Sequence, residues 1–116
     1  MALFGRVDLV DLQFREAELP EVPHAPVRLP VAAWFVFART LWLAGRRSGC
    51  EGLTDFRARV RHAAYQLAVQ SDTHPRIAVI GHGVFNRYLA SELRDAGFSG
   101  LATPKIGHAD FTVYTR

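Results

Sequence analysis

Apolar side chains recur at the spacing of an α-helix along much of the chain. Residues 31–43 form one such stretch, which follows Pro30, suited to a first helical turn, and stops before Gly45, a residue that commonly ends helices. Residues 54–68 form a second stretch, with Thr54 as the expected N-cap. The apolar positions are Trp34, Phe35, Phe37, Ala38, Leu41 and Trp42 in the first stretch and Phe56, Val60, Ala63, Ala64 and Leu67 in the second, whereas Arg57, Arg59 and Arg61 fall on a face that we expect to be solvated.

A third helical pattern begins after Gly83 and ends at Gly97. Three other stretches predict β-strands. Residues 77–80 are a continuous apolar run, typical of a strand buried on both faces, whereas residues 7–12 and 109–115 alternate between apolar and polar positions. We therefore expect residues 77–80 to lie at the centre of a sheet with a paired strand on each side.

The remaining segments read as connections. Prolines are frequent in residues 20–30, which predicts a fixed, extended strap, and residues 98–107 predict a loop. Together these elements predict an α/β fold with about three strands and three helices. The two tryptophans and two phenylalanines of residues 31–43 indicate packing in a core or beneath a lid, with stacking on a cofactor as the alternative.

The apolar run of residues 77–80 breaks at Gly81-His82-Gly83. His82 is thereby expected at the carboxyl end of a strand and at the start of a helix, where ligands gather in open α/β sheets and where free amides attract anions. Gly81 and Gly83 allow the backbone to approach a ligand closely. The pattern predicts a site for phosphate or a similar anion, with His82 as proton carrier or hydrogen-bond donor. A turn histidine satisfied by the backbone is the alternative.

Composition narrows the functional classes. The chain has 116 residues, 22% of them charged, and a formal net charge of +3, which fits one small domain. Its arginines are dispersed, with Arg46-Arg47 the only adjacent basic pair, so we expect a phosphorylated small molecule as partner and no nucleic acid. The single cysteine, Cys50, and the absence of a signal-like start or a membrane-length apolar stretch predict a cytoplasmic protein that does not insert in a membrane.

The order of the segments resembles the histidine phosphatase superfamily, also called phosphoglycerate mutase-like. Gly81-His82-Gly83 followed by Arg87 is similar to the family's second-histidine motif, and Phe14-Arg15-Glu16 is similar to the segment that supplies its proton donor. The helical stretch with its two tryptophans, then Glu51 and the stretch that starts at Phe56, resemble the family's insert and the following helix. Gly107-His108-Ala109 and the stretch after it resemble the final turn and strand.

One motif of the family is missing from these residues. Members start with a strand that ends in Arg-His-Gly, whose histidine becomes phosphorylated, and a second phosphate-binding arginine follows. The only Arg-His pair here is Arg61-His62, which Ala63 follows inside a predicted helix. The resemblance therefore implies that residues 1–116 are a single partial domain, an incomplete three-layer phosphoglycerate mutase-like fold that begins after the nucleophile.

The resemblance also implies roles for individual residues. His82 would be the second catalytic histidine and Glu16 the acid that protonates the leaving alkoxide, with Glu18 as a weaker candidate and a surface carboxylate as the alternative reading of Glu16. The Gly81-His82-Gly83 turn and the amides of Gly83 and Val84 would bind phosphate. Arg87 would either reach the substrate or, as we prefer, anchor its helix to a carboxylate.

The function implied is that of a phosphate-monoester hydrolase or phosphomutase by descent, inactive as an isolated chain because the nucleophile is absent. The alternative is a non-catalytic module that binds a phosphate ester or another protein through an exposed sheet edge. We expect no cofactor and no metal, since His82 and His108 lack a third ligand, and no serine nucleophile, since Ser91 and Ser99 lack an elbow motif. We expect a macromolecular partner, either an identical copy or a separate N-terminal fragment that supplies the missing strand.

Overall fold

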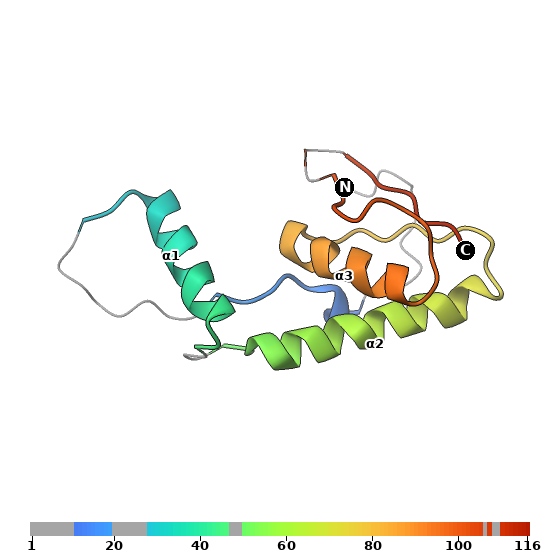
Figure 1. The fold of residues 1–116 in the computed structure, drawn as a ribbon, viewed down its shortest axis with the longest axis horizontal. Helices are drawn as coiled ribbons and strands as arrows, with labels where there is room; N and C mark the ends of the chain where they lie inside the picture. Colours follow the sequence, from blue (N-terminus) through green and yellow to red (C-terminus); the bar gives the residue numbers. More distant parts are fainter. Residues whose placement is uncertain (1–10, 20–27, 47–49, 106, 108–109) are drawn as a thin grey trace.

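A computed structural model describes residues 11–19, 28–46, 50–105, 107 and 110–116 (Figure 1). Their regular elements, in chain order, are the short 3-10 helix η1 (Leu12–Phe14) and the α-helices α1 (Val31–Leu43), α2 (Leu53–Ser71) and α3 (Gly83–Asp95). Helices α2 and α3 lie side by side, and α1 lies beyond one end of this pair (Figure 1). The positions of the predicted helices are thus confirmed.

The prediction of an α/β fold is wrong for the described residues, which contain no β-strand. Residues 77–80 are extended but form no ladder with another described residue, and Ile77 and Ile80 are 42% and 73% exposed. The only bridge among the described residues is the antiparallel pair Ser99–Thr115, which joins the predicted loop of residues 98–107 to the last residue of the predicted third strand. A strand requires a neighbour that accepts and donates its backbone hydrogen bonds, and an apolar run carries no information on whether that neighbour exists.

Two predicted segments fall largely outside the described residues. Residues 1–10 contain most of the expected first strand, and its last residue, Leu12, belongs to η1. Residues 20–27 contain most of the proline-rich strap, of which residues 28–30 are described. Pro30 is the N-cap of α1, immediately before the first turn in which the sequence pattern expected it.

The helix boundaries agree with the expected stop signals. Gly45 and Gly97 follow the C-caps of α1 and α3 with φ angles of 89° and 97°, a left-handed conformation that glycine adopts without a Cβ penalty. The start of α2 differs from the prediction, because Gly52 is its N-cap and Thr54 lies inside the first turn. Thr54 is therefore not the cap.

The core lies between α2, α3 and the segment that includes η1. Phe56 of α2 is fully buried at its centre, and its ring contacts those of Trp42, Phe85 and Tyr88 edge to face, with centroids 5.1, 6.5 and 5.2 Å away. Phe14 reaches the same cluster through Phe85, at 5.8 Å. Edge-to-face contacts bring the positive ring edges onto negative ring faces, so they add specificity to the burial of apolar area. The predicted stripe of α2 is confirmed as the buried face.

The prediction that α1 packs its aromatic residues in a core holds for only part of the helix. Trp42 is fully buried and Ala38 nearly so, whereas Phe35 and Phe37 are 56% and 44% exposed. Within the described residues, α1 is fixed mainly at its C-terminal end, where the Trp42 indole Nε1–H donates to the Glu51 carbonyl at 2.8 Å. No helix among the described residues is long and apolar enough to cross a lipid bilayer.

Candidate functional site

The carboxylate of Glu16 lies on the first turn of α3. Its Oε1 accepts a hydrogen bond from the Phe85 amide at 2.8 Å, and its Oε2 accepts one from the Val84 amide at 3.1 Å. The Ala17 amide donates to the same Oε1 at 2.9 Å. The first amides of an α-helix have no partner within the helix and carry the positive end of its dipole, so a carboxylate stabilises this position. Glu16 therefore supplies the cap of α3 from a segment far away in the sequence.

His82 is the N-cap residue of α3 but does not cap it with its side chain. Its backbone is extended, with φ −112° and ψ 162°, and its carbonyl accepts the first helical hydrogen bond from the Asn86 amide at 2.7 Å. The imidazole is exposed. The residue therefore starts α3, as the Gly-His-Gly pattern predicted, while the preceding strand is absent from the described residues.

The two glycines beside His82 have different surroundings. A Cβ added at Gly81 would overlap the side-chain oxygen of Asn86 and meet the Phe85 ring at 3.5 Å. A Cβ at Gly83 would meet nothing within 4 Å. A side chain at Gly81 therefore requires the Asn86 side chain to move, whereas Gly83 leaves open space in front of the helix start.

Arg87 and Glu18 lie outside the contact between Glu16 and α3. Arg87 is exposed on α3 and makes no ion pair with another described residue, so both of its predicted roles stay predictions. The Glu18 Oε2 accepts from the Glu51 amide at 2.8 Å, and its Oε1 lies 3.9 Å from the Arg15 Nε. Glu18 thus faces the approach to α2 and not the start of α3.

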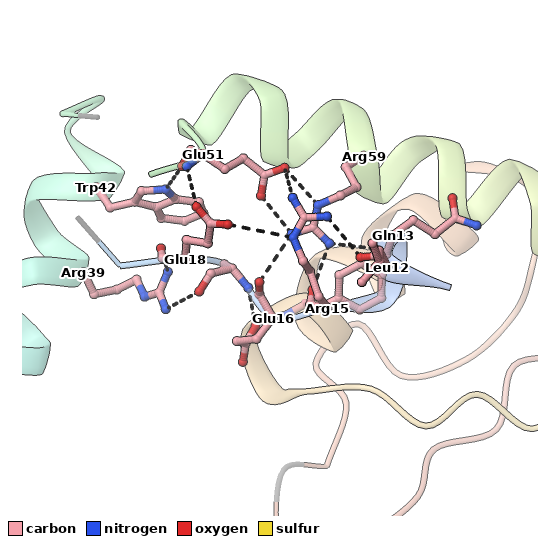
Figure 2. Close-up of polar contacts among 11 residues, drawn as sticks. Leu12, Gln13, Arg15, Glu16, Glu18, Arg39, Trp42, Glu51 and Arg59 are labelled. Carbon is pink, nitrogen blue, oxygen red and sulfur yellow. Dashed lines mark hydrogen bonds and ion pairs between the residues drawn. The ribbon is translucent and has the colours of Figure 1, made fainter. Parts of the chain in front are cut away.

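Arg59 is the residue that sequence reasoning missed, because its position was assigned to a solvated face. Its side chain is 10% exposed and forms a bidentate ion pair with Glu51, with Nε to Oε1 at 2.9 Å and Nη2 to Oε2 at 2.8 Å (Figure 2). The signal that could have found it is its spacing, since residue 59 is three positions after Phe56 and four before Ala63, on the buried side of α2.

The polar groups joined around Arg59 hold residues 13–18 against two helices. Arg59 donates to the carbonyls of Gln13 and Arg15 at 2.6 and 2.8 Å, and Arg39 of α1 donates to the carbonyls of Ala17 and Glu18 at 3.3 Å each (Figure 2). The Arg39 guanidinium also lies over the Trp42 ring, 4.9 Å from its centroid. These contacts fix the segment on both sides of Glu16.

The described residues place His82, the open position of Gly83 and the Glu16 carboxylate at the start of α3. No three His, Cys, Asp or Glu side chains lie together as metal ligands would within the described ranges. The amides of Val84 and Phe85 at this helix start have the Glu16 carboxylate as their acceptor.

A family model named histidine phosphatase superfamily (branch 1) matches residues 11–116. The chain therefore belongs to this superfamily, and the resemblance drawn from the sequence is confirmed. The matched range includes both Glu16 and His82. The chain has no significant match among curated proteins or among solved structures.

Proposed function

We propose that these residues form the phosphoryl-binding and acid part of a histidine phosphatase, a phosphate-monoester hydrolase or phosphomutase by descent. His82 and the start of α3 bind the phosphoryl oxygens of a phosphorylated small molecule, and Glu16 gives its proton to the departing alkoxide. The observation that carries the proposal is the contact of the Glu16 carboxylate with the amides of Val84 and Phe85. It supports a common site for an acid and a histidine that lie far apart in the sequence.

The same contact gives an order of events. The Val84 amide cannot donate fully to Glu16 and to a phosphate oxygen at once, and two negative charges at one helix start repel each other. A bound phosphate therefore displaces the Glu16 side chain from α3. The displaced carboxylate takes up a proton from water beside the negatively charged phosphate and can then act as the general acid. Phosphate binding and release of Glu16 are one step in this proposal.

Turnover requires a nucleophile that these 116 residues lack, since they contain no Arg-His-Gly. We propose that the isolated chain binds phosphate without hydrolysing phosphate esters, and that a segment bearing the nucleophilic histidine completes the site. A cytoplasmic location, in keeping with the single cysteine Cys50, belongs to the same proposal.

Two measurements test the proposal. Inorganic phosphate is titrated into the chain while amide NMR spectra are recorded, and we expect shifts at Gly83 and Val84 that His82→Ala weakens. Glu16→Ala should bind phosphate more tightly than the wild type, because it removes the competing carboxylate. Absence of any shift at these amides would contradict the binding site.

Hydrolysis of p-nitrophenyl phosphate by the purified chain should be negligible. Robust hydrolysis that His82→Ala abolishes would show that these residues do contain a nucleophile and that its absence from them is wrongly inferred. Robust hydrolysis that survives His82→Ala would place the chemistry elsewhere in the chain.

The exposed residues 77–80 favour a second candidate function, which is pairing with another polypeptide. Ile77, Val79 and Ile80 are 42%, 38% and 73% exposed, and their backbone makes no hydrogen bond to another described residue. An extended apolar segment of this kind accepts a neighbouring strand readily. We propose an identical copy or a complementary N-terminal fragment as the partner. Light scattering should report association that Ile80→Lys removes, and a strictly monomeric wild type unaffected by added fragment would contradict it.

A further inference from the structure

We propose that Arg59 is a positioning residue for Glu16, which keeps the carboxylate of Glu16 on the first turn of α3. The inference rests on the proposed function only for what Glu16 does there. Arg59 holds the segment that carries Glu16, and the Glu16 carboxylate thereby stays at the start of α3, a helix much later in the chain.

All five N–H groups of the Arg59 guanidinium have acceptors. Two donate to the carbonyls of Gln13 and Arg15 through Nη1, and two others pair with the Glu51 carboxylate through Nε and Nη2. The fifth, on Nη2, points at the Glu16 carbonyl at 3.4 Å. Since a guanidinium has five N–H donors and no acceptor, Arg59 has none left for a ligand. Its role at the site is therefore exerted through the residues it binds.

Three of the acceptors are backbone carbonyls that flank the Glu16 side chain. The segment around η1 has little regular structure of its own, so its carbonyls have few intrasegment partners. Arg59, on α2, donates hydrogen bonds to these carbonyls. It thereby fixes the position of residues 13–16 relative to α2 and α3. The Glu16 carboxylate reaches the amides of Val84 and Phe85 from that position.

The guanidinium is itself held on three sides. Glu51 fixes its edge through two parallel hydrogen bonds, a geometry in which arginine and carboxylate match as planar forks. Its central carbon lies over the rings of Phe56 and Phe85, 5.1 and 5.6 Å from their centroids. Phe85 also donates its amide to Glu16, so the same residue contacts both the positioning arginine and the positioned carboxylate.

Lysine cannot replace this arrangement. An ammonium group has three donors on one atom and cannot hold the Glu51 carboxylate in two parallel bonds while it also reaches three carbonyls. Arg59→Lys therefore keeps the charge and loses the geometry, which makes it the informative variant. Arg61→Ala is the matched control, because Arg61 lies on the same helix, its side chain is 74% exposed, and it forms an ion pair with Glu92 at 3.5 Å that involves neither Glu16 nor Glu51.

The experiment measures amide hydrogen exchange of the full chain by NMR. In Arg59→Lys, exchange at Val84 and Phe85 should rise about tenfold, while exchange at Leu89 and Leu93 in the body of α3 stays within twofold of the wild type. Arg61→Ala should change neither pair. A uniform rise along α2 and α3 in Arg59→Lys would overturn the proposal, since it would show a general loss of stability.

A double-mutant comparison separates positioning from an independent effect. In a Glu16→Ala background the amides of Val84 and Phe85 have already lost their acceptor, so Arg59→Lys should add no further exchange there. An additive increase would overturn the proposal. The phosphate titration described above is a separate readout: if exchange behaves as expected and phosphate does not bind, the proposed function fails while the positioning role stands.

Discussion

Removal of the Glu16 carboxylate should destabilise the fold mainly through the start of α3. Glu16→Ala leaves the amides of Val84 and Phe85 without their protein acceptor and removes a negative charge from the positive end of the helix dipole. Loss of an N-cap acceptor costs about 0.5–2 kcal/mol, and loss of a charge at this end costs about 0.3–1 kcal/mol. Because water replaces part of both, we expect the free energy of unfolding to fall by about 1–2 kcal/mol.

A charge-matched pair of variants tests the reasoning. Glu16→Gln keeps one oxygen acceptor and loses the charge, so its loss should be about 0.3–1 kcal/mol. Asp95→Asn makes the same change of charge at the exposed C-terminal end of α3, where a negative charge is unfavourable, so it should be neutral or slightly stabilising.

Urea unfolding followed by helical circular dichroism and by the fluorescence of the buried Trp42 gives all three free energies. The capping role of Glu16 is refuted if Glu16→Ala and Asp95→Asn change the free energy of unfolding equally, or if Glu16→Gln loses more stability than Glu16→Ala.

Three further outcomes are expected. Phe85→Ala empties a fully buried position between two other rings and should lower the free energy of unfolding by about 3–5 kcal/mol, measured in the same urea experiment; a loss below about 1 kcal/mol would contradict the described core. Gly81→Ala should destabilise because its Cβ overlaps the Asn86 side chain, whereas Gly83→Ala should be neutral or stabilising, and the reverse order of their unfolding midpoints would exclude the described turn. Burial raises the pKa of Tyr114 above its usual 10.0, so the unfolded chain loses this proton first and the stabilisation present below pH 10.0 is lost as pH rises through the higher folded value. Subtracting the ultraviolet titration curve of Tyr114→Phe from that of the wild type gives the titration of Tyr114. Its midpoint should lie above pH 10.0, and a midpoint below pH 10.0 would contradict the burial of this side chain.

The sequence was sufficient for what is local. The helices at residues 31–43 and after Gly83 could be predicted together with their ends, because the stop signals at Gly45 and Gly97 act within one or two turns of the chain. The histidine at the start of α3 followed from the same local logic. Family membership also followed, since it depends on the order of short segments along the chain.

The sequence was insufficient wherever a distant partner decides the outcome. Residues 77–80 have the composition of an inner strand, yet no described residue forms β-sheet hydrogen bonds with them. Composition does not show whether a pairing strand is present. Arg59 has the charge of a surface residue, yet Glu51 and three carbonyls of another segment draw it inward. Glu16 was assigned to the site by resemblance. Its contact with the α3 amides could not be predicted, because it depends on the hydrogen bonds that Arg59 makes to the segment around Glu16.

The most direct test of the account is an NMR measurement of scalar coupling across hydrogen bonds. The account predicts correlations from the amide nitrogens of Val84 and Phe85 to the side-chain carboxyl carbon of Glu16, since both amides donate to it, at 3.1 and 2.8 Å. These correlations should vanish in Glu16→Ala and weaken in Arg59→Lys. A wild-type spectrum with well-resolved correlations inside α3 and none to Glu16 would contradict the claim that this carboxylate caps the helix that His82 begins.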